Sequence, residues 1–257
     1  MTDRRLSFLV AGVQKAGTSA LHDYLSEVRG LQLPASKELH FFDDEQRVDW
    51  SAPDYGPLHD HFVADDRRRG EVTPITLYWP QALERVAAYH PAMRLVLLFR
   101  DPVGRAFSHW QMEWARGAER MTFAQAIRDG RARMAGGAPV PGFDRVASYV
   151  ERGFYGRQLD RAQRLFGRDR VLCLSQDRLA HDPDGTVGQI CRFLKVMPPD
   201  ASLRPRRVRA APAIDYPSVL LPEDVAHLDA CFAAELERFE SLLEDPTDFA
   251  FLSRRDG

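Results

Sequence analysis

The residues best suited to chemistry lie in segment 12–19, Gly-Val-Gln-Lys-Ala-Gly-Thr-Ser. This segment stands between an apolar stretch that predicts a strand over 6–11 and a pattern that predicts a helix over 17–28. Backbone N–H groups in such a turn, together with the positive end of the helix, attract anions, and glycine allows a phosphate to approach closely. We therefore predict a phosphate-binding loop formed by Gln14, Lys15, Ala16, Gly17, Thr18, Ser19 and Ala20.

The position of the lysine separates this loop from the G-x-x-x-x-G-K-[ST] loop of nucleoside-triphosphate kinases. Thr18 follows Gly17, and Lys15 lies inside the loop. This arrangement favours a nucleotide with a single 5′-phosphate group over ATP. The chain has only three lysines, at positions 15, 37 and 195, and its other basic residues are arginines. A lysine at position 15 therefore indicates a specific role. The alternative is a structural glycine turn with an exposed lysine, and either Thr18 or Ser19 is expected to cap the helix.

A second phosphate-binding position is predicted after the apolar stretch 94–99. Arg100 stands at the carboxyl end of this predicted strand, where open parallel sheets bind ligands, and an arginine fork suits a phosphate. A helix is expected to begin at Pro102, with Ser108 about two turns into it and Arg105 near the same face. The alternative is a local Arg100–Asp101 ion pair beside an incidental serine.

Strands that alternate with helices predict how these residues are positioned. Further strands are expected over 70–73 and 170–174, and further helices over 80–89, 122–134, 153–166, 182–194 and 222–243. This order is typical of an α/β fold with a P-loop-like parallel sheet and helices on both faces. We expect a single domain over residues 1–257.

Composition narrows the class of protein. Of the 257 residues, 44% are hydrophobic and 28% are charged, and the net charge of −2 gives no reason to expect nucleic acid as a partner. Three scattered cysteines indicate neither disulfides nor a zinc site, and we expect no metal. No stretch has the length of a membrane span, and the first residues do not form a signal peptide. The sequence thus predicts a soluble cytoplasmic protein, and its arginine bias indicates a GC-rich bacterial genome.

Five segments together resemble the PAPS-dependent sulfotransferases (PAPS is 3′-phosphoadenosine-5′-phosphosulfate), particularly the heparan sulfate sulfotransferases and their bacterial relatives. The similarity covers roughly residues 6–195. The segments are the loop with its helix, Lys-Glu-Leu-His-Phe-Phe, Gly-Glu-Val-Thr-Pro, the stretch from Arg100 to Trp110, and a late strand with its Asp-Pro turn, at 12–25, 37–42, 70–74, 100–110 and 170–183. The resemblance implies a sulfotransferase-type fold and an enzyme that moves a sulfuryl group from PAPS to an acceptor hydroxyl or amine, releasing 3′,5′-adenosine bisphosphate (PAP).

The resemblance also implies roles for the donor-binding residues. The loop would hold the 5′-phosphosulfate, with Lys15 neutralising charge at the bridging oxygen, while Arg100 and Ser108 would hold the 3′-phosphate. The family's late basic loop has no clear match, but an arginine-rich stretch, 204–209, stands in its place. We expect Arg206, Arg207 or Arg209 of this stretch to cover the 3′-phosphate. The alternative is a solvated basic loop.

For the general base, the matching family residue is Glu38, and His40 is the second choice because imidazole titrates near neutrality. His40 could instead be a half-buried aromatic against the two phenylalanines, and Lys37 either contacts a substrate or is solvated. His109 is placed either near the sulfuryl group or on the surface of its helix.

The acceptor stays open at this point. Where heparan-type enzymes often have a lysine, this chain has Val72, which argues against a highly anionic glycan. A small molecule, glycan, lipid or peptide all fit, as do O- and N-sulfation, and the oligomeric state is not specified. Two other functions compete: a small-molecule kinase that uses ATP·Mg²⁺, and a non-catalytic nucleotide- or anion-binding module.

Overall fold

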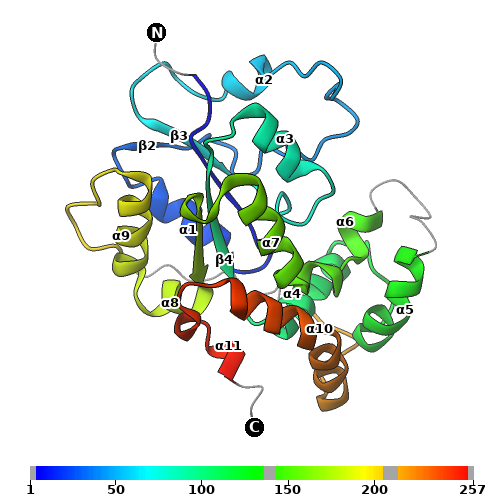
Figure 1. Cartoon of the computed structure of the whole chain (residues 1–257). Helices are drawn as coiled ribbons and strands as arrows, with labels where there is room; N and C mark the ends of the chain where they lie inside the picture. The colour runs from blue at the N-terminus through cyan, green and yellow to red at the C-terminus, as the bar shows by residue number, and fades with distance from the viewer. Residues whose placement is uncertain (1–3, 136–142, 205–213, 254–257) are drawn as a thin grey trace. The chain divides into compact units, whose positions relative to one another are not determined.

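The computed structural model describes residues 4–135, 143–204 and 214–253. Its centre is a sheet of five parallel strands in the order β2-β3-β1-β4-β5 (Figure 1). The strands are β1 (Phe8–Gly12), β2 (Leu31–Gln32), β3 (Arg68–Val72), β4 (Arg94–Phe99) and β5 (Val171–Ser175). The predicted α/β fold with a parallel sheet is confirmed.

The strand sequences explain this sheet. In β4, Arg-Leu-Val-Leu-Leu-Phe, every residue after Arg94 is buried, as expected for a strand covered on both faces. The neighbouring β1 is buried along its whole length. Strands β1 and β3 pair in parallel with Val10 opposite Val72, so both end at the same edge of the sheet. The segments that follow these two strands therefore start side by side.

Helices are packed around the sheet and in a second group. They are α1 (Thr18–Leu25), α2 (Gly56–His59), α3 (Ala82–Tyr89), α4 (Pro102–Ala115), α5 (Phe123–Ala135), α6 (Phe143–Ala147), α7 (Tyr155–Phe166), α8 (Gln176–His181), α9 (Pro183–Leu194), α10 (Pro222–Leu242) and α11 (Ala250–Ser253), with 3-10 turns at Glu151–Gly153, Arg168–Arg170 and Pro246–Asp248. The seven predicted helices correspond to α1, α3, α4, α5, α7, α9 and α10. The short β2, α2, α6 and α8 were not predicted, because two to six residues carry too little periodicity.

Contacts divide the chain into two compact units. The first comprises residues 1–99, 160–208 and 247–250 and contains the sheet. The second comprises residues 100–159, 209–246 and 251–257 and is helical. In the second unit, Leu228, Phe232, Leu236 and Phe239 form the buried stripe of α10. The Asp224 side chain, which is almost fully buried, accepts a hydrogen bond from Arg128 at 2.7 Å and joins α10 to α5.

The strand order defines where the first unit can bind a ligand. From β1 the chain crosses toward β2 and β3, and from β3 it crosses back over β1 to β4. Right-handed crossovers in opposite directions place α1 and α3 on opposite faces of the sheet. The carboxyl ends of β1 and β4 are therefore the topological switch point, the usual ligand position in this type of sheet.

Gly70 provides a test of the packing between β1 and β3. It lies opposite Phe8, and a Cβ at position 70 would come within 2.3 Å of the buried Phe8 ring. We expect Gly70→Ala to lower the free energy of unfolding by about 1–3 kcal/mol through overpacking. Urea denaturation of the full chain measures the change.

The matched control is Gly188→Ala in α9. A Cβ there would have only the end of the Arg192 side chain, 3.7 Å away, as a neighbour. Alanine in a helix interior should raise stability by about 0.5–1 kcal/mol. Equal effects of the two substitutions would contradict the packing argument.

Candidate functional site

The phosphate loop, residues 13–17, connects β1 to α1. Its start is fixed to the neighbouring strand because Val13 N donates to Leu98 O at 2.8 Å, and Ala16 N closes a turn onto Val13 O at 3.2 Å. Lys15 and Gly17 have φ values of 71° and 90°, in the left-handed region. Glycine at position 17 meets this backbone requirement without strain, which explains the second glycine of the motif.

The amino end of α1 is open to an anion. Gly17 is the N-cap residue and, because it has no side chain, it makes no side-chain cap hydrogen bond to the first turn. The prediction that Thr18 or Ser19 caps the helix is therefore wrong: Gly17 occupies the cap position, so both hydroxyl residues fall inside the helix. First-turn N–H groups without a side-chain cap are suited to a phosphate or sulfate oxygen. The loop thus fits the anionic group that the sequence predicts for it.

The predicted catalytic segment is attached to the same edge of the sheet. Thr73, which follows β3, donates to Glu71 Oε2 at 2.9 Å, and Leu39 N donates to that oxygen at 3.4 Å. On the neighbouring strand, Leu77 N donates to Ala11 O at 2.9 Å, one residue before Gly12. The phosphate loop and the segment around Leu39 are therefore both held at the carboxyl edge of β1 and β3.

Four charged side chains gather in this segment, and we call them the Glu38 cluster: Lys37, Glu38, His40 and Asp43. Lys37 Nζ contacts Glu38 Oε1, and His40 Nε2 lies 3.3 Å from Glu38 Oε2. His40 Nδ1 lies 2.9 Å from Asp43 Oδ2. The Asp43 side chain is fully buried, whereas Glu38 and His40 remain 36% and 40% exposed, so a substrate can reach them. Lys37 is paired with Glu38, which disagrees with the alternative of a solvated side chain, and its contact with a substrate stays a prediction.

The cluster fixes the charge of its members. Burial alone would raise the pKa of Glu38, but the hydrogen bond from His40 and the charge of Lys37 outweigh it and lower the pKa to about 2. Hydrogen bonds to Asp43 and then to Glu38 raise the pKa of His40 to about 9. At neutral pH, Glu38 is therefore a carboxylate and His40 an imidazolium. This protonation disagrees with the predicted base role of His40, because an imidazolium has no free lone pair to accept a proton.

Two acidic residues of this site had no predicted role. Asp43 directly follows the Phe-Phe pair and, three residues after His40, meets its imidazole, a spacing that the sequence displays. Glu71 belongs to the Gly-Glu-Val-Thr-Pro segment, but its burial was not visible in the sequence. Complete burial raises the pKa of Glu71 to about 7, despite the hydrogen bond from Thr73.

In the second unit, Arg100 and Ser108 belong to one side of α4. Asp101 caps this helix by accepting from Gly104 N at 2.8 Å and Val103 N at 3.4 Å. A Cβ at Gly104 would lie 3.4 Å from Arg100 Nη2, so the guanidinium lies over the first turn. Ser108 comes four residues after Gly104, on the same helical face, and is partly exposed. Arg100 and Ser108 thus share a helix face, as binding of one phosphate would require.

Two neighbouring residues do not lie where the sequence suggested. Arg105 is fully buried and donates through Nη2 to Tyr149 O, so it does not join the Ser108 face. Burial lowers the pKa of its guanidinium. His109 is also fully buried, with its ring 4.8 Å from the Tyr149 ring and Nε2 3.7 Å from Glu113. Of the two predicted placements of His109, the helix surface is wrong, because its face of α4 packs into the unit, and a placement near the sulfuryl group stays a prediction.

Two other predictions concern the basic loop and Val72. Arg206, Arg207 and Arg209 lie outside the described residues. Val72 is fully buried in β3 and brings no charge to this edge.

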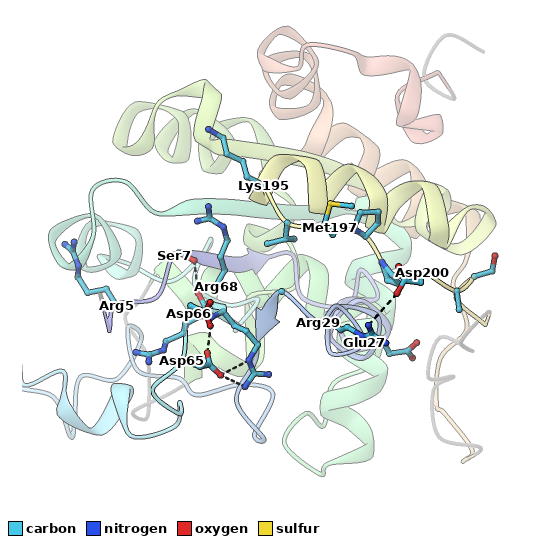
Figure 2. A pocket seen from close by; sticks show the side chains of 18 of the residues that line it. Arg5, Ser7, Glu27, Arg29, Asp65, Asp66, Arg68, Lys195, Met197 and Asp200 are labelled. Atoms are coloured by element: carbon cyan, nitrogen blue, oxygen red, sulfur yellow. Dashed lines mark hydrogen bonds and ion pairs between the residues drawn. The ribbon is translucent and has the colours of Figure 1, made fainter. Parts of the chain in front are cut away.

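A cavity of about 1250 Å³ in the first unit lies away from this site. Figure 2 shows its lining, which includes Ser7 and Arg68 at the amino ends of β1 and β3, opposite the phosphate loop. Several of its charges neutralise one another, for example Arg67 with Asp65 at 2.7 Å. Another pair is Arg29 with Asp200 at 3.6 Å (Figure 2). We therefore assign the candidate site to the carboxyl edge of β1 and β3 and not to this cavity.

In 4–135, 143–204 and 214–253, no group of three or more His, Cys, Asp or Glu side chains has an arrangement that could hold a metal ion. No helix of the described chain combines the length and apolar character needed to cross a membrane.

Comparison with known proteins gives a family match. Residues 6–207 match the family model described as Sulfotransferase domain. Human heparan sulfate glucosamine 3-O-sulfotransferase 6 is 33% identical over 192 residues, which cover 72% of this chain and 51% of that protein. Human heparan sulfate glucosamine 3-O-sulfotransferase 3B1 is 29% identical over 189 residues, covering 72% and 45%. The chain thus spans about half the length of these curated relatives.

Solved structures agree with this match. A sulfotransferase from Alicyclobacillus acidocaldarius superposes with a TM-score of 0.78 and 26% identity, covering 97% of this chain and 99% of that one. Mouse sulfotransferase SULT7A1 complexed with PAP has a TM-score of 0.54 at 13% identity, covering 99% and 89%. The second similarity is one of fold alone.

The protonation of His40 can be measured directly. We expect its imidazole to titrate near pH 9 in the folded protein, because Asp43 and Glu38 both stabilise the imidazolium. Asp43→Asn should lower this pKa more than Glu38→Gln, since the hydrogen bond to Asp43 has the larger effect. NMR titration of the ring resonances, assigned with His40→Ala, gives the values. Titration of His40 near its ordinary pKa of 6.5 would show that the cluster does not form as described.

Proposed function

Because this chain belongs to the sulfotransferase domain family, we propose that it is a PAPS-dependent sulfotransferase. It would transfer a sulfuryl group from PAPS to an acceptor hydroxyl or amine and release PAP. The observation that supports this function best is the common location of two features at the carboxyl edge of β1 and β3. One is the amino end of α1 behind Lys15, where the N-cap residue Gly17 offers no side-chain cap, and the other is the ionised Glu38.

The donor is proposed to bind as the motif order implies. The 5′-phosphosulfate would contact the N–H groups of Gly17, Thr18 and Ser19, where the positive end of α1 favours negative charge. Lys15 would neutralise the charge that develops on the bridging oxygen. Arg100 and Ser108 would bind the 3′-phosphate, supported by the helix face that they share. Because the family match includes residues of both units, we treat residues 1–257 as one functional domain.

The reaction is an exchange of one bond to sulfur for another. The acceptor oxygen or nitrogen forms a bond to sulfur, the bond from sulfur to the bridging phosphate oxygen breaks, and the bonding pair leaves with PAP. Glu38 accepts the acceptor proton. Its low pKa makes it a weak base, so transfer to Glu38 is expected late, when the new bond to sulfur has made that proton strongly acidic. His40, as an imidazolium, keeps Glu38 ionised and oriented.

We also propose that the protein is cytoplasmic. Cys173, Cys191 and Cys231 form no disulfide in the part of the chain that the structure describes, which supports a reducing, cytoplasmic compartment. The chemistry assigned to Lys15 and Glu38 uses charge and hydrogen bonds.

Binding of the product tests the donor site. We expect PAP to raise the melting temperature far more than AMP does, without Mg²⁺, because a ligand that binds only the folded state stabilises it. Lys15→Ala should reduce this shift. The matched control is Lys195→Ala, which removes a lysine with a similar backbone, φ of 56° against 71°, at the opposite edge of the sheet. Stabilisation by ATP·Mg²⁺ alone would instead establish the kinase, and no stabilisation by any nucleotide would favour the non-catalytic module.

Kinetics test the roles in the Glu38 cluster. With PAPS and a panel of acceptors, Glu38→Gln should lower kcat by about 100-fold or more, the usual contribution of a general base, and leave PAP binding intact. The raised pKa of His40 predicts that kcat/KM falls as pH rises through about 9, where the imidazolium loses its proton. His40→Ala should cost less activity and remove this alkaline limb. Full activity of Glu38→Gln, or a larger loss in His40→Ala, would contradict this assignment.

A further inference from the structure

A smaller cavity of about 440 Å³ adjoins the Glu38 cluster within the first unit. It is formed by the segment from Leu39 to His61, and its size is in the range of small-molecule pockets. His40 lines it, and the same imidazole contacts Glu38. The cavity and the proposed base are therefore connected through one side chain.

Part of the cavity wall is apolar and well supported. Leu39, Phe41, Val48, Pro57 and Leu58 contribute to it. The Phe41 ring packs against Phe42, Trp50 and Tyr55, with centroid distances of 5.4, 5.8 and 5.7 Å. Such a wall favours a ligand with an apolar or aromatic body, because binding removes apolar surface from water without ordering a loose pocket.

The polar part of the wall carries excess negative charge. Asp44 is neutralised by Arg47, with Nε 2.5 Å from Oδ2. Asp49 and Asp54 accept from the backbone N–H groups of Ser51 and Gly56, and across residues 4–135, 143–204 and 214–253 neither forms an ion pair with a basic side chain. Hydrogen bonds from Ser51 lower the pKa of Asp49, which keeps it ionised. The positive charge of His40 is already shared between Glu38 and Asp43.

We propose that this acceptor cavity binds a small acceptor with an apolar body and an uncharged or cationic hydroxyl- or amine-bearing group, and that it excludes polyanionic glycans. Two carboxylates at the wall repel a sulfated or carboxylated chain and attract a cation. This proposal rests on the sulfuryl transfer proposed above, and it assigns that transfer an acceptor class different from the one named in the human relatives.

The first test compares three acceptors with PAPS: 2-naphthol, which is uncharged, tyramine, which is cationic, and N-sulfated heparosan, which is polyanionic. We expect kcat/KM for both small acceptors to exceed that for the polysaccharide by about tenfold or more. A preference for heparosan, or no transfer to either small acceptor while PAP still raises the melting temperature, would overturn the acceptor class alone. No stabilisation by PAP would overturn the sulfotransferase function itself.

The second test fills the cavity. Val48→Trp should raise KM for 2-naphthol and tyramine by about tenfold, and the stabilisation by PAP should not change. The control, Val63→Trp, adds the same volume at a side chain that is 62% exposed and outside the cavity. An unchanged KM in Val48→Trp, or an equal loss in both variants, would show that the acceptor binds elsewhere.

The third test removes the charge. The double variant Asp49→Asn with Asp54→Asn keeps an oxygen acceptor for each backbone N–H group but removes both negative charges. We expect the ratio of kcat/KM for tyramine over 2-naphthol to fall about fivefold, as is typical of exposed charge pairs. Asp60→Asn, in the same segment but outside the cavity, should leave this ratio unchanged. A ratio that does not respond to the double variant would overturn the charge argument.

Discussion

The candidate site depends on one buried carboxyl group, that of Glu71. Its Oε2 atom accepts from Thr73, at the end of its own strand, and from Leu39 N, in the segment that carries Glu38 and His40. A loop without regular structure is thereby held against the rigid edge where the phosphate loop begins. A carboxyl group in a fully buried position strongly prefers its neutral form, and the pKa of about 7 reflects this preference. Burial therefore favours the protonated form of Glu71, whereas the hydrogen bonds from Thr73 and Leu39 favour its carboxylate.

The cluster around Glu38 has its own dependence on pH. The lowered pKa of Glu38 means that its ionised form contributes stability above about pH 4.5, and this is lost as pH falls toward 2. The raised pKa of His40 means that its contribution is complete below about pH 6.5 and is lost as pH rises through 9. Because the pKa of Glu71 is raised, its ionisation lowers the free energy of unfolding as pH rises from 4.5 to about 7. The three effects together favour the assembled cluster between about pH 4.5 and 6.5.

Much of the fold could be read from the sequence, because buried parallel strands are continuous apolar runs. The strand over 94–99 was predicted with the bounds of β4, and α4 begins at Pro102 as predicted, with Asp101 as an N-cap that the structure adds. The errors have physical causes. Position along α4 does not tell that His109 faces the core, since its partner Tyr149 is forty residues away. The pKa of His40 is near 9 because its imidazole contacts both Asp43 and Glu38, a geometry that the sequence does not reveal. Since imidazole usually titrates near neutrality, the sequence suggested that His40 is a base.

The two proposed substrate sites have different structural origins. The proposed donor site follows directly from the sheet, since the phosphate loop leaves β1 and its start is fixed by the hydrogen bond from Val13 N to Leu98 O in β4. The proposed acceptor cavity belongs instead to the irregular segment between His40 and His61, which contributes no strand to the sheet. Such a segment can change its charge and shape without disturbing β1 or the open end of α1. Membership of the family therefore constrains the donor chemistry more than the acceptor, and under the proposal made here the segment from Leu39 to His61 would determine the acceptor.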